Sequence, residues 1–417
     1  LHDICSNDSI LRNSAKLLIY RCLEVGSTAS YNFQHGPSSR LVVNTVLPWV
    51  AELLGRRDPL IRNCGIELLR YAVVRGHILD FCCLCDQNEE VDVFLNLCHI
   101  QSHRRARAIR QLHAPEVLSS VEPRLYWTYV IPLFMVFLGD PSADVAATAV
   151  DALGHTVKIL ESAEYVKVIC RLLHLAHRAS ELQKFHLRGA TCMLENLRTH
   201  YEPYGDFDDR LVRRGEAADL GALYSTALPL AQACITLRRD AQSSEQGSSQ
   251  YLQTSAISCV SSMLALFDHE KSEAGTLCVL KFIIENMSSR SEKLRDNAMT
   301  ALKFISIKLG ERHLPLIIRV LRNGRTTGFH LHVLGKAIHV LVSNCVNMSP
   351  EIATVVFVEI VPTLQANLFG SARDRMDSKS TKPVVEAKPS YSLKTISLIA
   401  ALLKDGDSLI KFVRTFV

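Results

Sequence analysis

VIPLFMVFLGDPSADVAATAVDALGHTV, residues 130–157, joins a proline-bearing apolar helical run to a second helical run through a short Gly-Asp-Pro turn. Residues 53–74, LLGRRDPLIRNCGIELLRYAVV, repeat this arrangement. Asp58 and Asp140 are placed to cap the second helices. The prolines that follow them fit the first helical turn, because a proline there removes only an amide that has no partner anyway. Each stretch therefore predicts an antiparallel helix pair.

Five apolar segments carry the same proline-bearing phrase. They are VLPWVAELLG, VIPLFMVFLG, ALPLAQACITL, HLPLIIRVLRNG and IVPTLQANLFG, around Pro48, Pro132, Pro229, Pro315 and Pro362. The gaps between these prolines are 84, 97, 86 and 47 residues. One or two units of roughly 40–47 residues fit the gaps, and this is the period of HEAT and armadillo arrays. The pattern predicts an all-α HEAT/armadillo-type solenoid of stacked antiparallel helix pairs, a fold suited to holding other molecules.

The segment SEKLRDNAMTALKFISIKLG, residues 291–310, divides into two helical faces. Apolar residues recur at helical spacing, and charged residues occupy the opposite side. We expect burial of Leu294, Ala298, Ala301, Leu302, Ile305 and Leu309, and solvation of Lys293, Asp296, Lys303 and Lys308. One face therefore packs on neighbouring helices, and the other is available to partners.

Composition and segmentation indicate an ordered array with two interruptions. The chain has 417 residues, 48% of them hydrophobic and 21% charged, which is enough to bury a continuous apolar strip. The expected order is generic HEAT-type repeats at 1–88, HEAT-type repeats with an Arg-rich segment (102–113) at 89–200, polar excursions around a helix at 201–250, HEAT-type repeats with a basic segment (293–336) at 251–368, an irregular arm at 369–391 and C-terminal helices at 392–417. We interpret the irregular segments as flexible spacers or as arms that order on a partner.

The ends of the chain and its apolar runs bear on its setting. Leu1 is neither an initiator methionine nor part of a signal segment, so we interpret the sequence as an excerpt of a longer protein. Apolar runs such as VIPLFMVFL are shorter than the roughly 18 residues of a membrane span. We therefore expect no membrane insertion.

Most of the 13 cysteines are scattered singly along apolar helical stretches, as buried reduced thiols of an intracellular protein are. The exception is a cluster in which Cys82, Cys85, Cys98 and His103 match a zinc site of three thiolates and one imidazole. Packing residues are the favoured alternative, because the second half of the cluster belongs to an arginine-rich segment with a better explanation. We predict no metal and no other cofactor.

Catalytic motifs are missing from the sequence. It contains no phosphate-binding GxxxxGK[ST] loop, no HExxH zinc helix, no GxSxG elbow and no GxGxxG fingerprint. Several of the 16 histidines, such as His174, His177, His186 and His339, lie in partly apolar helical stretches that favour a structural role. We therefore predict no enzymatic activity.

Positive charge is concentrated in two segments, although the formal net charge is only +5. Residues 293–336 hold nine Lys and Arg residues against two acids, and SHRRARAIRQLH at 102–113 holds four arginines and no acid. Arginines three residues apart on a helix share one side, which suits charge-assisted contact with phosphates. The candidate contacts are Arg104, Arg105, Arg107, Arg110, Lys303, Lys308, Arg322, Arg325 and Lys336. The open alternatives are a solvated face or arginine–carboxylate pairing between repeats.

At the basic segments the chain resembles a known family. EEVDVFLNLCHIQSHRRARAIRQLHA at 89–114 resembles a characteristic stretch of the DRIM (down-regulated in metastasis) family. EKLRDNAMTALKFISIKLGERHLPLIIRVLRNGRTTGFHLHVLGKAIHVLV at 292–342 is similar to a second one, followed by LFGSARDRM and VEAKPSYSLKTISLIAALL. The resemblance covers about 89–417. Asn297 and Ala298 stand where the family pattern leads us to expect arginine.

The resemblance implies a non-enzymatic nucleolar scaffold. Members of the family are very large HEAT-repeat proteins of the small-subunit processome, so the implied partners are pre-rRNA, the small nucleolar RNA particle and other ribosome assembly factors. A membrane or a small-molecule substrate is not implied. The alternatives are a karyopherin-like nuclear transport receptor or an armadillo-type regulatory subunit of a kinase or phosphatase. Transport receptors are usually acidic, whereas this chain has a pI near 8.5.

Overall fold

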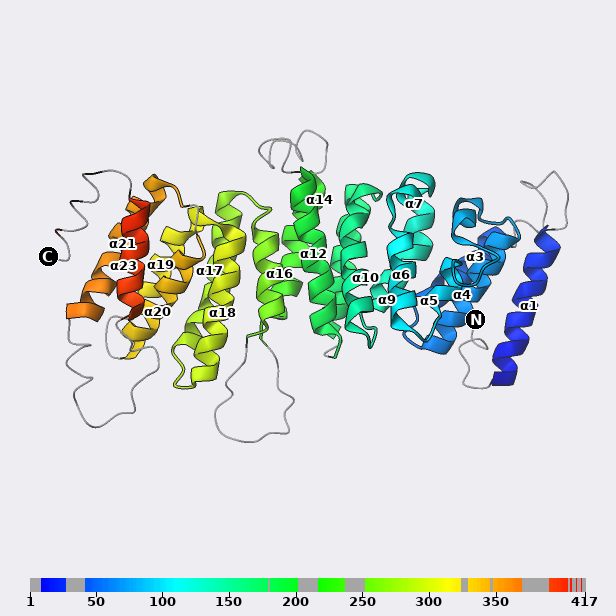
Figure 1. Cartoon of the computed structure of the whole chain (residues 1–417), viewed down its shortest axis with the longest axis horizontal. Coiled ribbons are helices and arrows are strands. Elements are labelled where there is room, and N and C mark those ends of the chain that lie inside the picture. The colour runs from blue at the N-terminus through cyan, green and yellow to red at the C-terminus, as the bar shows by residue number, and fades with distance from the viewer. Residues whose placement is uncertain are drawn as a thin grey trace. The chain divides into compact units, whose positions relative to one another are not determined.

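A computed structural model describes residues 9–27, 42–178, 181–201, 217–236, 252–323, 329–345, 348–369 and 390–403, with the single residues 406, 410 and 414. Within these ranges every regular element is helical, and one isolated bridge joins Thr236 to Leu252. The all-α prediction is confirmed. The chain divides into two compact units, Leu1–Pro203 and Tyr204–Val417, and each is described by itself (Figure 1).

The first unit is a series of paired helices. Its elements are α1 (Ser9–Ser27), η1 (Val42–Val46), α3 (Leu47–Leu54), α4 (Pro59–Val74), η2 (Leu79–Leu84), α5 (Val93–Leu97), α6 (Ser102–Leu112), α7 (Pro115–Ser120), α8 (Pro123–Leu125), η3 (Tyr126–Val130), α9 (Ile131–Phe137), α10 (Ala143–His155), η4 (Thr156–Lys158), α11 (Ser162–Arg178) and α12 (Gln183–Tyr201). Each pair packs on the next through its second helix, as α6 does on α10 and α10 on α12. The core is therefore a strip of apolar side chains between the helices.

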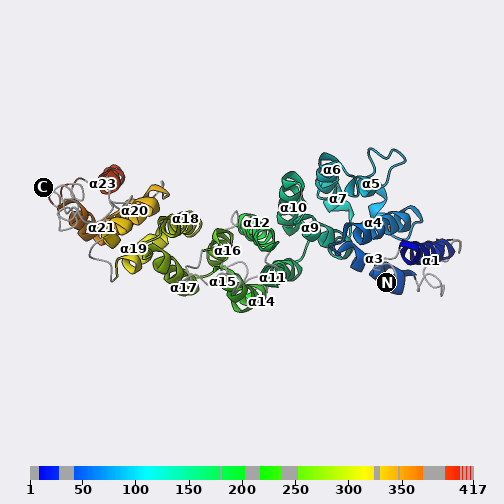
Figure 2. The ribbon, with the colours of Figure 1, turned by 90° about the horizontal axis from the view of Figure 1, so that it is seen from below.

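The second unit forms a two-layered stack. Its elements are α14 (Ala217–Ala222), η6 (Leu223–Ala227), α15 (Leu228–Ala233), α16 (Thr254–Leu264), α17 (His269–Met287), α18 (Glu292–Leu309), η7 (Glu311–His313), α19 (Leu314–Arg322), α20 (Phe329–Ser343), α21 (Pro350–Phe369) and α23 (Ser390–Leu402). One layer runs α16, α18, α20 and α23, and the other runs α17, α19 and α21. Figure 2 shows α18 and α20 on one side of the stack and α17 and α19 on the other.

The repeated prolines occupy one structural position in four of the five segments. Pro48, Pro132, Pro229 and Pro315 are each the second residue of an α-helix. A five-residue π-helical turn precedes the first three, and a 3₁₀ turn precedes the fourth. A proline has no N–H and its ring collides with the carbonyl four residues earlier, so a local departure from α geometry admits it. Pro362 differs, because it lies inside α21.

The two predicted aspartate caps have different outcomes. Asp58 caps α4 as predicted, and its carboxylate accepts a hydrogen bond of 2.8 Å from the N–H of Leu60. The prediction for Asp140 is wrong, because α10 begins at Ala143 and Ser142 occupies its N-cap position. Asp140 accepts from the N–H of Ser142, ahead of the helix, and an arginine of α6 binds both of its oxygens. The carboxylate of Asp140 therefore binds Arg105 and does not cap α10.

The two faces predicted for α18 are confirmed. All six apolar residues of the predicted stripe are buried, from Leu294 to Leu309. Lys293, Asp296 and Lys303 are exposed, and Lys308 is half-buried. The 3.6-residue period of the sequence therefore located the packed face of this helix correctly.

The longest apolar helix among the described residues is α21, and it corrects the expectation that the apolar stretches are all shorter than a membrane span. Residues Glu351–Phe369 are long and apolar enough to cross a membrane by length and composition alone, with a mean hydropathy of 1.6 and a third of the segment buried. This helix packs against α19, α20 and α23. Glu359 in its middle binds two arginines of α19. We therefore treat α21 as a helix of the stack.

Much of the two predicted irregular segments lies outside the described residues. Within 201–250 the structure describes Tyr201 and residues 217–236, which form α14, η6 and α15. Within 369–391 it describes only Phe369, Ser390 and Tyr391. Arg325 also lies outside the described part of the chain.

Candidate nucleic-acid interface

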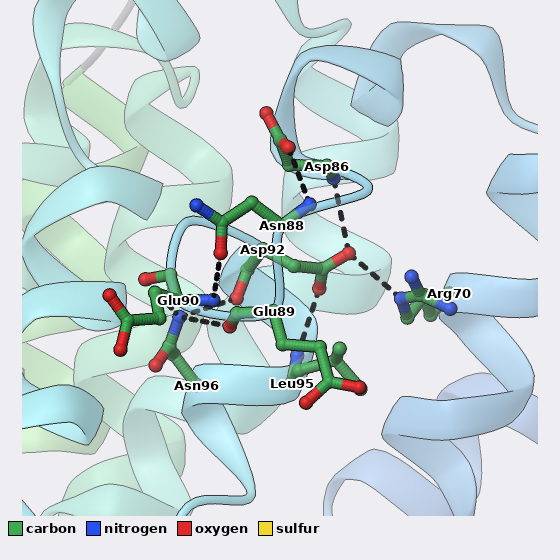
Figure 3. Close-up of polar contacts among 8 residues, drawn as sticks. All are labelled: Arg70, Asp86, Asn88, Glu89, Glu90, Asp92, Leu95 and Asn96. Atoms are coloured by element: carbon green, nitrogen blue, oxygen red, sulfur yellow. Dashed lines mark hydrogen bonds and ion pairs between the residues drawn. The ribbon is translucent and has the colours of Figure 1, made fainter.

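The loop before the arginine-rich helix is organised around a buried carboxylate. Asp92 is 0% exposed. Its Oδ2 lies 2.8 Å from Nε of Arg70 on α4 and 3.1 Å from the N–H of Asp86, and its Oδ1 accepts from the N–H of Leu95 at 2.9 Å (Figure 3). Asp92 thereby caps α5, closes the loop and ties it to the preceding helix pair. Three donors thus bind the buried carboxylate, and the loss of any one of these donors would lower the stability of the fold.

Asn96 gathers the backbone carbonyls of the same loop. Its Nδ2 donates to the carbonyls of Glu89, Glu90 and Asp92 at 3.3, 3.0 and 2.7 Å. Figure 3 shows the amide nitrogen among these carbonyls. The side chain of Asn88 accepts from the N–H of Glu90, which tightens the turn. The three backbone carbonyls are therefore bound by a donor of the protein itself.

Arg105, in the middle of the arginine-rich segment, braces two helix pairs. Its Nε and Nη2 bind the two carboxylate oxygens of Asp140 at 3.0 and 2.9 Å, a bidentate pair. Its Nη1 donates to the carbonyls of His99 and Ile100 at 2.8 and 2.7 Å. The side chains of Arg105 and Asp140 are only 16% and 5% exposed. This guanidinium is occupied on every side by the protein.

The neighbouring arginines of α6 are partly occupied. Nη2 of Arg104 lies 3.1 Å from Oε1 of Glu90, and Nη2 of Arg107 donates to the carbonyl of Glu90 at 2.6 Å. Arg110 is exposed and has no ion pair among the residues that the structure describes. Of the four arginines, Arg110 is thus the most available to an outside anion.

The position of Arg105 recurs in other repeats. Arg62, Arg105 and Arg295 are each the fourth residue of their helices, α4, α6 and α18. Nη1 of Arg62 donates to the carbonyl of Arg57, and Nη1 of Arg295 donates to the carbonyls of Ser289 and Arg290. In each case the guanidinium satisfies carbonyls of the turn that precedes its own helix. An arginine at this position serves the turn between helices.

The second basic segment is also extensively paired. Lys336 of α20 binds Asp296 of α18 at 2.8 Å. Arg319 and Arg322 of α19 both bind Glu359 of α21, at 2.9 and 3.3 Å. These contacts link adjacent helices of the stack. Among the predicted contacts of this segment that the structure describes, Lys303 is exposed without an ion pair, while Lys308 is half-buried.

A basic face on α11 was missed in the sequence. Lys167, Arg171, His174 and Arg178 are exposed and follow one another at intervals of four, three and four residues. They therefore share one side of the helix. The basic residues of α11 do not form a dense run in the sequence, because the apolar residues of the packed face lie between them. A search for dense runs of arginine therefore does not find them. The i, i+4, i+7, i+11 spacing was the signal that could have found them.

The cysteines proposed for the alternative zinc site lie in different settings. Cys82 and Cys85 are at the end of η2, Cys98 follows α5, and His103 lies on α6. Burial raises the pKa of the Cys98 thiol to about 12 and that of the Cys85 thiol to about 11. Within the described ranges, no group of three or more His, Cys, Asp and Glu side chains is placed to hold a metal ion.

Comparisons with known proteins agree with the family resemblance. Residues 243–416 match the UTP20 family, described as the U3 small nucleolar RNA-associated protein 20 domain. Two proteins named U3 small nucleolar RNA-associated protein 20, from Schizosaccharomyces pombe and Saccharomyces cerevisiae, are each 24% identical to this chain. The alignments cover 97% and 96% of the chain but 17% and 16% of these relatives. The chain thus spans about a sixth of the length of the curated relatives that it matches.

A solved structure of Kap95p with RanGDP resembles the chain only loosely. It is 13% identical, and the match covers 99% of this chain and 60% of that one, with a TM-score of 0.33.

Proposed function

We propose, because this chain is of the UTP20/DRIM type, that it is a non-enzymatic scaffold segment of the small-subunit processome in the nucleolus. There it would support pre-rRNA processing by contacting pre-ribosomal RNA and assembly factors. The observation that carries the proposal is sequence similarity along 97% of the chain to a protein named for its association with U3 small nucleolar RNA. Helix pairs stacked in series supply the extended surface that such a role needs.

The mechanism that we propose is positional. Stacked helices present fixed side chains to separate parts of a particle, and exposed basic residues neutralise phosphates without reading the base sequence. The contacts predicted from the sequence are Arg104, Arg107, Arg110, Lys303, Lys308, Arg322, Arg325 and Lys336, together with Arg105, whose guanidinium is instead held by Asp140 and two turn carbonyls. Exposure favours Arg110 and Lys303 within this set, because both side chains are solvated and without an ion pair among the described residues.

Sedimentation tests the proposal. The full-length protein that contains this chain, carrying a tag, is run on a sucrose gradient from nuclear extract and probed together with pre-rRNA. We expect it to migrate with large pre-ribosomal particles and to shift when those particles are digested with nuclease. Migration near the top of the gradient would contradict the proposal. A position that responds to a small GTPase or to a catalytic subunit would instead support a transport receptor or a phosphatase regulator.

Ultraviolet cross-linking then tests the RNA contact. RNA fragments bound covalently to the tagged protein are sequenced, and we expect them to be enriched in pre-rRNA or in the small nucleolar RNA. If only background RNA is recovered while the protein still sediments with the particle, its contacts are with proteins alone.

A further inference from the structure

Helix α11 has one packed face and one solvated basic face. Its packed face is made of Tyr165, Val166, Val168, Ile169, Leu172, Leu173 and Ala176, all buried. The helix packs against α12. From Lys167 to Arg178 the basic residues span about 16 Å along the axis at about 1.5 Å per residue. Over this length the face carries basic residues with no acid among them.

The basic side chains of this face remain available to an outside partner. Within the part of the chain that the structure describes, Lys167, Arg171, His174 and Arg178 form no ion pair. The nearest acids along the sequence are Glu161, Glu164 and Glu181, which stand before the first and after the last of the four. Within α11, no acid therefore lies between the four residues. An exposed guanidinium or ammonium with no internal partner keeps its donors for an outside anion.

The surroundings of the stripe favour a phosphate backbone over an acidic peptide. Binding sites for peptides and proteins depend on apolar or aromatic anchors that are buried on contact. Among the described residues between Ile100 and Leu277, no large hydrophobic side chain is exposed. An acidic peptide would find charge on this surface without such an anchor. Phosphates need only charge and donors, and they supply most of the affinity of sequence-independent binding.

We propose that the α11 face, formed by Lys167, Arg171, His174 and Arg178, binds the phosphodiester backbone of RNA without reading its bases. The proposal rests on the proposed function and deepens it, because it assigns an RNA contact to residues outside the two basic segments of the sequence. The four side chains lie on a single helix whose position α12 supports, so the face is formed before RNA arrives.

Neutralisation of the stripe with a matched control tests this proposal. The test variant is K167Q/R171Q/R178Q in the full chain. The control variant R124Q/K281Q/K394Q removes the same formal charge from three exposed side chains on α8, α17 and α23, none of which has an ion pair among the described residues. Both variants should keep the circular dichroism spectrum and Tm of the parent chain.

The readout is the affinity for a poly-uridine 30-mer and for an RNA hairpin between 0.05 and 1 M salt. Each phosphate contact contributes about 0.7 to the slope of log K against log salt for a single strand, so the test variant should lose about 2 from this slope. At 0.1 M salt its affinity should fall on the order of 10–100-fold, and the curves should converge near 1 M. The control should lose much less.

Three outcomes would overturn the inference. An unchanged slope in the test variant, an equal loss in the control, or competition by polyglutamate as effective as competition by RNA of equal charge would each do so. The gradient experiment separates this failure from failure of the proposed function. If the test variant binds RNA normally and the full protein still joins the particle, the RNA-binding proposal for α11 is wrong and the scaffold proposal stands. If the full protein never joins the particle, the scaffold proposal itself is wrong.

Discussion

Helices α6 and α11 belong to the same unit and both carry a row of basic residues, yet the protein uses the two rows differently. On α6, Arg105 is held by Asp140 and by two backbone carbonyls, and Arg104 and Arg107 bind Glu90. On α11 the basic side chains reach solvent without an internal partner among the described residues. The density of basic residues in a sequence therefore does not show how many of them are free to bind an outside anion. What decides availability is whether a carboxylate or a turn carbonyl lies within reach.

The largest expected effect follows from breaking the pair between α6 and α10. In Arg105→Gln, Asp140 loses a bidentate partner while it remains almost entirely buried, and two turn carbonyls lose a donor. We expect the free energy of unfolding to fall by about 2–4 kcal/mol, as for an uncompensated buried charge. Urea denaturation measures this loss. Arg110→Gln, on the exposed side of the same helix, is the control and should change stability by less than about 0.5 kcal/mol.

Asp92→Ala should have the next largest effect, because it removes the acidic centre of the loop that leads into α6. Arg70 loses its carboxylate partner, and the N–H groups of Asp86 and Leu95 lose their acceptor. We expect a loss of about 2–3 kcal/mol in the free energy of unfolding. Hydrogen exchange should also accelerate at the amides of residues 86–97. If protection there is unchanged, the loop is held by something other than this carboxylate.

Helix α12, which packs against α11, carries a basic side chain that is buried instead of exposed, that of His186. Burial lowers the pKa of His186 from 6.5 to about 4, and Nδ1 of this residue has no hydrogen-bond partner among the described residues. A histidine that is harder to protonate when folded stabilises the fold fully above pH 6.5. This stabilisation is lost as the pH falls toward the folded pKa.

Between pH 7 and pH 4 the contribution of His186 should therefore decline by about 2–3 kcal/mol. Denaturant titrations at intervals of half a pH unit follow the decline. In His186→Leu the same curve should be flatter, because the leucine does not titrate. Parallel curves for the parent chain and the variant would show that His186 does not set this dependence.

The smallest effect on stability should come from α11 itself. Arg171→Gln changes an exposed side chain with no ion pair in the described structure, so unfolding should shift by less than about 0.5 kcal/mol. Thermal unfolding followed by circular dichroism suffices for the measurement. A large loss would mean that the residue braces the fold, as Arg105 does, and the contrast between the two helices would disappear.

The sequence predicted the local features well and the long-range ones poorly. The apolar stripe of α18 and the cap at Asp58 depend on neighbours within a few turns, and both predictions hold. The role of Asp140 depends on Arg105, 35 residues away, which no local pattern reveals. The π turns before the prolines also arise from a local backbone clash whose resolution the sequence does not specify.

For the candidate interface, composition was a misleading guide. The dense segment that ends in Arg110 attracted attention because it contains no acid, but Glu90 and Asp140 come to it from the loop before and the helix pair after. In the second segment, Glu359 of α21 plays the same part for Arg319 and Arg322. Only the fold brings these partners together, so pairing between helices could not be separated from RNA contact at the level of sequence.

The most direct measurement is the salt dependence of RNA binding for two variants in parallel, together with their unfolding temperatures. One variant is R104Q/R105Q/R107Q/R110Q on α6, and the other is K167Q/R171Q/R178Q on α11. Our account predicts that the α6 variant melts at a lower temperature and loses at most about 1 from the salt slope, the share of a single contact at Arg110. The α11 variant should keep its melting temperature and lose about 2. The reverse result, with RNA binding lost from α6 at full stability and retained without α11, would contradict the account.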